Sequence, residues 1–417
     1  MPSFFKLKKS EDVLRLIEQF GPSGEETVPL EYALGRVVSR DVISQEDLPH
    51  FFRSVVDGYA VRSRDTFGAS ESLPALLTIS GEILMGRQSP SGLSQGHAFR
   101  IATGGMLPEN ADGVVMIEHC HLLDEQTLEV SRAISPLENV IQPGDDFKKG
   151  GTVFKRGHKL RVQDLGLLAG LGRRQIRVYR KPRVAIISTG DEIVSVSEHP
   201  GPGQVRDINR YTLAAFCRSV GAEPVNAGRC PDHFEDLKTR LHKSLARAET
   251  VWISGGSSVG TRDLTLKVFE TLQDFELLVH GISISPGKPT IIGKSGTKPV
   301  VGLPGHVASA LVVADVFMGP LIQCLSGRTR SPENFQLEVE AVLSRNVESA
   351  TGREDYVRVK LVHQKDVLVA RPVFGKSGLI STLVESDGLI RIDLNTEGLY
   401  EGQKVKVRLS PHLSSSV

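Results

Sequence analysis

The segment VAIISTGDEIV, residues 184–194, begins a run of alternating strands and helices that decides the fold class. Its apolar start, VAIIST, is typical of a buried strand, because every position along it is apolar or small. The segments that follow alternate in type: helix RYTLAAFCRSVG (210–221), strand EPVNAGR (223–229), helix HFEDLKTRLHKSLARA (233–248), strand TVWISGG (250–256) and, later, the apolar helix VASALVVADVFMGPLI (307–322). Strands that alternate with helices of this length indicate βαβ units around a mainly parallel sheet.

Regions rich in β-like sequence lie on both sides of this α/β core. Short runs such as LLTISGEI and GVVMIE, separated by Gly, Pro, Asn and Asp, predict a β-rich inserted module. Runs such as FQLEVEAVL and YVRVKLV near the C terminus predict a small β-barrel or sandwich. The predicted domains are a helical or linker part at 1–50 that is completed by about 143–180, the β-rich module at 51–142, a central α/β domain at 181–328 and the C-terminal β domain at 329–417.

Composition excludes several classes of function. The 50 basic and 49 acidic residues among 417 nearly cancel, so the chain has no overall basic footprint for nucleic acid. The start, MPSFFKLKKSEDVLRL, lacks the apolar run of a signal peptide, and the apolar stretch 308–321 is too short and too interrupted to predict a membrane span. Four scattered cysteines without a CxxC pair fit a reducing compartment. We therefore expect a cytoplasmic protein that binds neither nucleic acid nor membrane.

Three polar, glycine-rich turns come directly after predicted strands of the α/β region. They read STGDE (188–192), SGGSSVG (254–260) and LPGH (303–306), and Asp263 lies at the start of the helix after the second turn. Ligands of open α/β sheets bind beyond the carboxyl ends of the strands. A Gly–Gly turn before a helix exposes several backbone N–H groups, which suit a phosphate or oxyanion. For each turn, the alternative is that glycine serves only the backbone geometry.

Charged residues near these turns suggest a ligand site with a cation. Lys288 stands between two prolines in SPGKP (285–289), which would hold it as a rigid partner for an oxyanion, although a solvated surface lysine is the alternative. Carboxylates that gather near phosphate-binding loops would supply the oxygen ligands of Mg²⁺, whereas capping of turns and helices is the alternative. These carboxylates belong to Asp57, Asp146, Glu192, Asp232 and Asp263.

One apparent metal motif, EHCH at 118–121, is not expected to bind zinc. If the segment is a strand, His119 and His121 face one side and Cys120 faces the other.

Taken together, the motifs resemble the molybdopterin molybdotransferase family, which includes the C-terminal domain of gephyrin. The match runs in the expected order along nearly the whole chain, and the spacing of STGDE, SGGxSxGxxD, PGKP and LPG is its most specific part. Other matching segments are SVVDGYAV (54–61), RIATGGMLPENADGVVMIE (100–118), PGDDFKKGG (143–151) and GQVRDINRYTLAAFCRSVGAEP (203–224).

The resemblance implies an activity, an assembly and partners. The activity is insertion of molybdate into adenylylated molybdopterin with Mg²⁺-dependent release of AMP, the last step of molybdenum cofactor biosynthesis. The assembly is an elongated homodimer of four-domain subunits, in which the site lies between the α/β domain and the β module of the partner subunit. The partners are a molybdopterin adenylyltransferase and the molybdoenzymes that accept the cofactor.

The resemblance also assigns roles to residues that match the family's motifs. The catalytic residues are predicted to be Asp57, Thr103, Asp146, Glu192, Asp232 and Asp263. Glu192, Asp232 and Asp263 are also predicted to be ligands of Mg²⁺. The residues predicted to bind the molybdopterin substrate are Thr189, Gly190, Ser254, Gly255, Gly256, Ser257, Ser258, Gly260, Lys288, Pro304, Gly305 and Ser377.

The chain departs from the family pattern at the third turn. The family usually has LPGNPVS, but here His306 and Val307 replace the Asn and second Pro. The change removes an amide and introduces a titratable imidazole, so it bears on the choice between molybdate and tungstate. A tungstate-preferring insertion enzyme therefore stays open as an alternative. Two further alternatives are a molybdopterin adenylyltransferase and a non-catalytic scaffold that binds the cofactor. The retained carboxylates argue against the scaffold.

Overall fold

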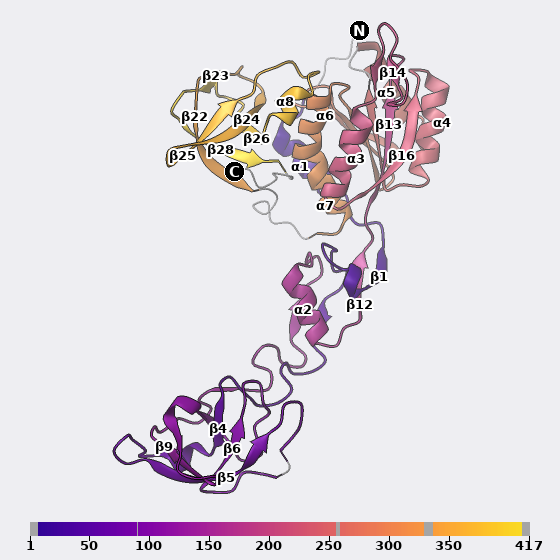
Figure 1. The fold of residues 1–417 in the computed structure, drawn as a ribbon. Coiled ribbons are helices and arrows are strands. Elements are labelled where there is room, and N and C mark those ends of the chain that lie inside the picture. Colours follow the sequence, from indigo (N-terminus) through magenta and orange to yellow (C-terminus); the bar gives the residue numbers. More distant parts are fainter. Residues whose placement is uncertain (1–6, 90, 256–258, 329–336, 411–417) are drawn as a thin grey trace. The chain divides into compact units, whose positions relative to one another are not determined.

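The computed structural model describes residues 7–89, 91–255, 259–328 and 337–410, and it leaves the side chains of 259–263 undescribed. The chain splits into two compact units (Figure 1). The first unit comprises Met1–Arg40, Arg156–Arg161 and Gln175–Val417. The second comprises Asp41–Lys155 and Val162–Arg174.

The α/β part of the first unit contains a six-stranded sheet, and its mainly parallel character confirms the prediction. The strand order is β16 (Glu223–Cys230), β13 (Arg183–Thr189), β17 (Thr250–Gly255), β21 (Lys298–Leu303), β20 (Ile291–Ser295) and β18 (Phe275–His280). The first four strands are parallel, and β20 runs antiparallel to both of its neighbours. The carboxyl ends of β16, β13, β17 and β21 therefore lie at one edge.

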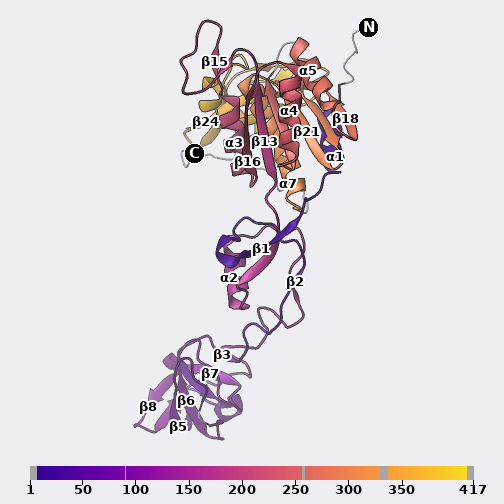
Figure 2. The same cartoon turned by 90° about the vertical axis from the view of Figure 1, so that its right-hand side faces the viewer.

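Helices cover both faces of this sheet, and the strands explain why. In β13, Val184 and Ile186 belong to one apolar cluster, whereas Ala185 and Ile187 belong to another. Because successive side chains of a strand point to opposite faces, a continuous apolar run needs cover on both. Figures 1 and 2 show the result, with one face covered by α3 (Asn209–Ser219) and α6 (Val307–Val313) and the other by α4 (Phe234–Leu245) and α5 (Val259–Phe269).

The apolar helix expected at 307–322 is continuous but irregular. It consists of α6, a π-helical segment at Ala314–Met318 and α7 (Gly319–Leu325). The prediction of an apolar, buried helix is therefore confirmed, but its middle is π-helical, where Pro320 supplies no N–H for the carbonyl four residues earlier. The stretch Val307–Leu325 is long and apolar enough to cross a membrane, but 83% of it is buried inside the protein, as in a core helix.

The C-terminal part of the first unit is a closed barrel, as predicted. Five strands pair in a ring: β24 (Glu354–Gln364), β25 (Val367–Pro372), β22 (Glu338–Leu343), β28 (Lys404–Leu409) and β26 (Gly388–Ile392), which returns to β24. Their inward side chains, including Val359, Ile390 and Val407, form the barrel core. A short strand from the α/β part, β19 (Ile284–Ser285), adds to β24 and joins the two domains.

The remaining elements of the first unit are short. Helix α1 (Ser10–Ile17) contributes Val13 and Ile17 to the core of the α/β part. Strand β1 (Glu25–Pro29) forms an antiparallel pair with β12 (Gln175–Tyr179).

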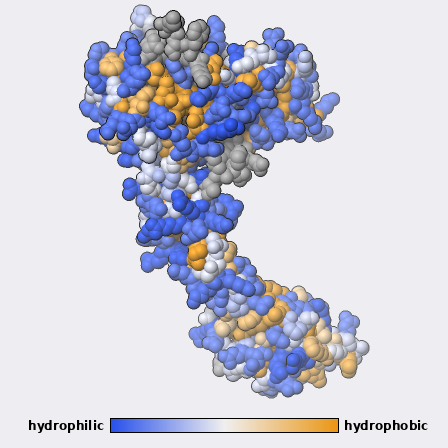
Figure 3. Space-filling view, turned by 180° about the vertical axis from the view of Figure 1, so that it is seen from behind, coloured by the Kyte–Doolittle hydropathy of each residue, from blue (hydrophilic) through white to orange (hydrophobic). Residues whose placement is uncertain are grey.

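The second unit is built on a six-stranded β-sheet, in agreement with the predicted β-rich module. Its order is β7 (Gly113–Met116), β4 (Gly58–Val61), β6 (His97–Ile101), β5 (Ala75–Ile83), β9 (Thr127–Val130) and β8 (Cys120–Leu122). Helix α2 (Val162–Gly170) belongs to the same unit. Figure 3 shows apolar side chains on the surface of this unit, where Leu73, Leu76 and Leu122 are exposed.

The structure corrects the strand expected at EHCH. Residues Ile117–His119 form a 3-10 helix, and only Cys120 and His121 of the motif lie in β8. The alternation of His119, Cys120 and His121 along one strand was therefore wrong. In the part of the chain that the structure describes, no group of three or more His, Cys, Asp or Glu side chains is arranged to hold a metal ion.

Candidate functional site

The turns predicted from the sequence meet at one cavity, beyond the carboxyl ends of β13, β17 and β21. The cavity has a volume of about 280 Å³. Five of the residues assigned to the site from the sequence line it: Thr189, Glu192, Ser254, Gly255 and Gly305. The rest of its lining includes the start of α3, at Asp207, Ile208 and Asn209, and Gly378 from the C-terminal domain.

Two glycines allow the turns to approach so closely. Gly255 has φ +156°, and a Cβ atom there would lie 2.0 Å from the backbone oxygen of Thr189, its partner on β13. Gly190 has φ +149°, and a Cβ atom there would lie 2.8 Å from Oε2 of Glu192. Glycine at 255 therefore lets the ends of β13 and β17 stay in register, and glycine at 190 lets the Glu192 carboxylate lie over the turn.

The carboxylate of Asp232 is held by the neighbouring turn. The hydroxyl of Thr189 donates a hydrogen bond of 2.6 Å to Oδ1 of Asp232. The backbone N–H of Asp232 donates in turn to Oδ1 of Asp191, at 3.1 Å. Thr189 is 2% exposed, so the β-sheet fixes its position. The structure thus brings together two residues, Thr189 and Asp232, that the sequence assigned separately.

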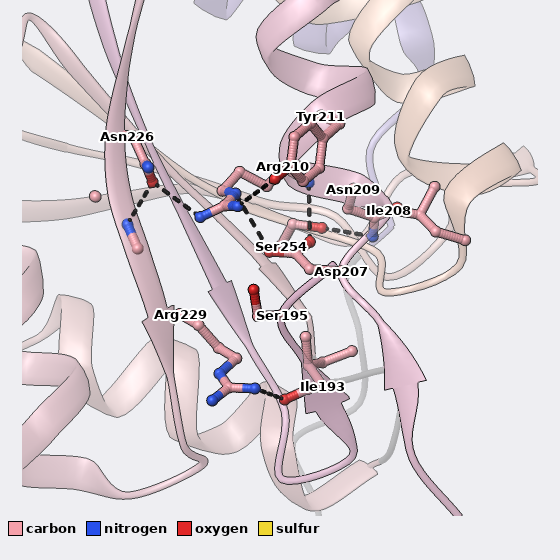
Figure 4. A network of polar contacts seen from close by, with 12 residues as sticks. Ile193, Ser195, Asp207, Ile208, Asn209, Arg210, Tyr211, Asn226, Arg229 and Ser254 are labelled. Atoms are coloured by element: carbon pink, nitrogen blue, oxygen red, sulfur yellow. Dashed lines mark hydrogen bonds and ion pairs between the residues drawn. The ribbon is translucent and has the colours of Figure 1, made fainter. Parts of the chain in front are cut away.

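Asn209 connects the second and third turns, although the sequence did not predict it as a site residue. Its side-chain N–H groups donate to Oγ of Ser254, at 2.8 Å, and to the backbone oxygen of Gly305, at 2.7 Å. Figure 4 shows Asn209 beside Ser254, at the beginning of α3. The preceding Asp207 is buried and accepts a hydrogen bond of 3.1 Å from the N–H of Arg210, which fixes the first turn of this helix.

Arginine side chains lie around the same helix start. Arg206 is exposed and is the one Arg or Lys among the described residues that line the cavity. Arg210 donates to Oδ1 of Asn226 on β16, at 3.4 Å, and Arg229 donates to the backbone oxygen of Ile193, at 2.6 Å (Figure 4). Arg206 therefore offers a positive charge to an anionic ligand in the cavity.

The third turn also contacts the C-terminal domain. Nδ1 of His306 forms a hydrogen bond of 2.8 Å with Oγ of Ser377, and the N–H of Ala308 donates to the backbone oxygen of Ser377 at 3.1 Å. His306 lines the cavity and departs from the family pattern. Its bond to Ser377 places Ser377 beside the cavity. Pro304 is buried behind this turn and does not line the cavity.

Lys288 lies on a fourth turn, between β19 and β20. It is exposed on the turn after β19, and it is absent from the described residues that line the cavity. The turn packs on the far end of α6, because a Cβ atom at Gly287 would lie 2.6 Å from Cγ2 of Val313. The turn leads into β20, whose first residue, Ile291, pairs with Gly302 near the carboxyl end of β21.

Several predicted residues have no described side chain. Gly256, Ser257 and Ser258 lie outside the described residues. Gly260 and Asp263 fall in α5, where the backbone is helical but the side chains are not described.

Two predicted residues of the second unit contact each other. Oδ1 of Asp57 accepts hydrogen bonds from the backbone N–H of Thr103, at 2.7 Å, and from its hydroxyl, at 3.0 Å. These two bonds, the backbone bond first, lower the pKa of the Asp57 carboxyl. Asp146, in the same unit, is exposed, and its N–H donates to the backbone oxygen of Leu48 at 3.0 Å. Asp57 is therefore held as a charged carboxylate.

Replacing Thr103 with valine is expected to raise the pKa of Asp57. The variant keeps the backbone bond but loses the hydroxyl, and a lost hydrogen bond to the charged form favours protonation. As the pH falls, the Asp57 carboxylate of the variant should therefore take up its proton at a higher pH than that of the wild type. Titration by NMR measures this directly. Asp124 is an internal control, since its lowered pKa depends on Gln126 and Thr127 and should not change.

Comparison with known proteins decides the family. Three family models match the chain in succession: "MoeA N-terminal region (domain I and II)" at residues 8–172, "Probable molybdopterin binding domain" at 185–323 and "MoeA C-terminal region (domain IV)" at 340–409. The chain belongs to the MoeA family. The resemblance inferred from the STGDE, PGKP and LPG motifs is thereby confirmed.

MoeA-family relatives match over almost the full length. A putative molybdopterin biosynthesis protein of Methanocaldococcus jannaschii is 35% identical over 393 residues, which cover 92% of this chain and 91% of that protein. A molybdopterin molybdenumtransferase of Haemophilus influenzae is 32% identical over 404 residues, covering 96% and 97%. A solved molybdopterin biosynthesis MoeA protein from Pyrococcus horikoshii is 37% identical with a TM-score of 0.82, covering 97% and 99%.

In this MoeA-family chain, one signal could have identified Asn209. The residues Asp207-Ile208-Asn209 stand immediately before the predicted helix 210–221, where Asp and Asn commonly act as caps. Asp207 does serve the helix start, but both donors of Asn209 are directed to other turns. The sequence alone does not distinguish these two uses.

Proposed function

We propose that this chain inserts molybdate into adenylylated molybdopterin and releases AMP, as the last step of molybdenum cofactor biosynthesis. The observation that carries the proposal is the single cavity at which three strand-end turns, the Glu192 carboxylate and the start of α3 meet, in a chain of the MoeA family. A cavity at the carboxyl edge of a parallel sheet is the usual place for a ligand in this architecture.

The residues of the cavity suit an adenylylated, phosphate-bearing substrate. Exposed backbone N–H groups at the turns and the charge of Arg206 would hold the pyrophosphate group. Asp232 does not itself line the cavity but is bonded to Thr189, which does; it would orient a reacting water, since the bonds to Thr189 and Asp191 fix its position before substrate arrives. His306, held by Ser377, would contact the oxyanion at the opposite side of the cavity.

The carboxylates that follow β13 and β16 have the donor chemistry that suits Mg²⁺. Glu192 and Asp232 offer only carboxylate oxygens, which suit a hard cation, and Mg²⁺ is commonly bound by one or two carboxylates together with substrate phosphates and water. Asp263 is proposed as a further ligand because of its place in the family motif. When bound, Mg²⁺ would neutralise negative charge on the pyrophosphate as the anhydride opens.

Replacing Asn209 with alanine is expected to weaken substrate binding. The change removes the donors to Ser254 and Gly305, each worth about 0.5–1.5 kcal/mol, so we expect roughly a tenfold or greater rise in the Kd of adenylylated molybdopterin. Calorimetric titration of the substrate without oxyanion measures this. Asn226→Ala is the matched control, because Asn226 lies on β16 and does not line the cavity. An equal loss in both variants would contradict the role of Asn209.

The active assembly is proposed to be a homodimer in which Asp57, Thr103 and Asp146 of one subunit complete the site of the other. Family membership and the exposed apolar side chains of the second unit support this proposal. Asp57→Ala and Asp232→Ala subunits, each inactive alone, should regain about a quarter of wild-type activity when mixed, because half of the dimers are mixed and each has one intact site. No recovery after verified subunit exchange would show that each site uses one chain.

The decisive experiment measures AMP release from adenylylated molybdopterin with Mg²⁺ while molybdate and tungstate are titrated in parallel. Release that depends on molybdate supports the proposal, and a lower half-saturation point for tungstate would instead favour the tungstate-preferring alternative. Consumption of ATP with unmodified molybdopterin would indicate an adenylyltransferase. Bound substrate without release would indicate a scaffold. The adenylyltransferase and the acceptor molybdoenzymes remain proposed partners, in the cytoplasm.

A further inference from the structure

A second cavity, of about 340 Å³, lies in the first unit at the opposite edge of the α/β sheet. Lys181 and Gly221, which line it, precede β13 and β16, so it opens at the amino ends of these strands. Helix α7, the segment 35–37, Tyr179 at the end of β12 and β28 of the barrel supply the other walls. None of its lining residues was assigned to the proposed reaction.

The junction that forms this cavity is tightly packed. Gly327, directly after α7, has φ +72°, and a Cβ atom there would lie 2.2 Å from Cδ2 of Tyr179 on β12. The guanidinium of Arg36 donates a hydrogen bond of 2.8 Å to the backbone oxygen of Tyr179. The hollow beside Tyr179 is therefore part of a fixed junction within the unit.

Positive charge dominates the lining. The basic side chains are Arg36, Lys159, Arg180, Lys181, Arg328 and Arg408, whereas the one carboxylate among the described lining residues is that of Asp315. Asp315 pairs with Arg408, at 3.4 Å, and Arg36 pairs with Glu26. With six basic side chains and one carboxylate, the described lining carries more positive than negative charge, while the whole chain carries a net charge of only +1.

Burial disfavours the charged form of two of these basic side chains, Lys159 and Arg328. Although Lys159 is exposed as a residue, partial burial lowers the pKa of its ammonium group, and the charge of Arg328 lowers it further. Burial also lowers the pKa of Arg328, whose Nη1 donates to the neutral side-chain oxygen of Gln323 at 3.3 Å. An anion between Lys159 and Arg328 would remove their repulsion and replace lost hydration.

We propose that this cavity is a binding site for a small phosphate-bearing compound, separate from the site of the proposed reaction. The basic side chains bind the phosphate through charge-assisted hydrogen bonds. Phe216, Val220 and Leu409 form apolar walls that accept a compact organic part. The volume is near the lower end of the range for small-molecule pockets, roughly 300–1,000 Å³, which limits the ligand to a small compound.

The first test measures binding of inorganic pyrophosphate by calorimetric titration at low ionic strength. Lys159→Gln is expected to weaken binding about tenfold, the loss of one charge-assisted contact. Lys155→Gln is the matched control, because Lys155 is also exposed but lies outside the cavity. Molybdenum transfer should be unchanged in both variants, and pyrophosphate bound at the carboxyl-edge cavity should be unaffected by either substitution, so a loss specific to Lys159→Gln reports this second cavity. Unchanged pyrophosphate affinity in Lys159→Gln would overturn the proposal.

The second test locates the site chemically. Pyridoxal phosphate carries a phosphate and an aldehyde, which condenses with a lysine amine to an imine and water, and borohydride then supplies the hydride that reduces the imine. Peptide mapping by mass spectrometry should find the label at Lys159 or Lys181 in preference to Lys155, with protection by pyrophosphate. Labelling spread evenly over surface lysines, or unaffected by pyrophosphate, would contradict the site.

Discussion

A Gly255→Ala variant is expected to lose at least about 100-fold in kcat/KM for AMP release and to unfold at a lower temperature. The added methyl group would lie 2.0 Å from the oxygen, 2.8 Å from the carbonyl carbon and 2.6 Å from Cγ2 of Thr189. Two of these atoms belong to the backbone, so the clash can be relieved only if the ends of β13 and β17 separate. Overpacking of this kind costs about 1–3 kcal/mol, and the φ of +156° adds strain.

The loss of activity follows from the side chains that the ends of β13 and β17 position, Thr189 and Ser254. Separation of β13 from β17 moves Thr189 away from Asp232 and Ser254 away from Asn209, and misplacement by about 1 Å costs roughly 100-fold in rate. Scanning calorimetry and AMP release measure the two effects. Gly21→Ala is the control, because a Cβ atom there meets nothing within 4 Å. Full activity of Gly255→Ala would show that the close approach of these turns is unimportant.

The second large effect is expected for Asp232→Asn, which should lower kcat about 100-fold or more while leaving the melting temperature nearly unchanged. An asparagine oxygen can still accept the Thr189 hydrogen bond, so the fold of the turn is kept. The variant loses the negative charge that would accept a proton or bind Mg²⁺, and such acid–base groups contribute about 10²–10⁴-fold.

A carboxylate four residues away provides the matched control for this variant. Asp236 lies on α4 with its side chain 61% exposed, and it pairs with His233 at 3.2 Å. Asp236→Asn should retain wild-type kcat. If Asp232→Asn also retained it, Asp232 would be a structural partner of Thr189 alone.

The α/β core could be predicted because its signals are local. The run 184–187 is apolar at every position, which predicts a strand covered on both faces, with the polar turn after it at the carboxyl edge. The meeting of Thr189, Ser254 and Gly305 at one cavity follows from the parallel order of three strands. Because Glu192 belongs to the turn directly after β13, it was also predicted at the carboxyl edge of the sheet, and it lines the cavity there.

The remaining features depend on contacts between distant residues. The sequence cannot show that both donors of Asn209 are used by Ser254 and Gly305, because these partners are 45 and 96 residues away. Lys288 was expected beside the turns for its charge, and its turn does lead into β20 at the carboxyl end of β21, but the described lining of the cavity does not include it. At EHCH, a 3-10 turn interrupts the alternation that a single strand would have. Tertiary packing decided each of these cases.

The closed barrel has a consequence for association between chains. A ring of strands offers no free edge to a foreign strand, so the C-terminal domain resists edge-to-edge aggregation, and its one extra strand, β19, comes from the same chain. The weakest closure is the seam between β22 and β25, where only two residue pairs, Val342–Val369 and Leu343–Ala370, are in register.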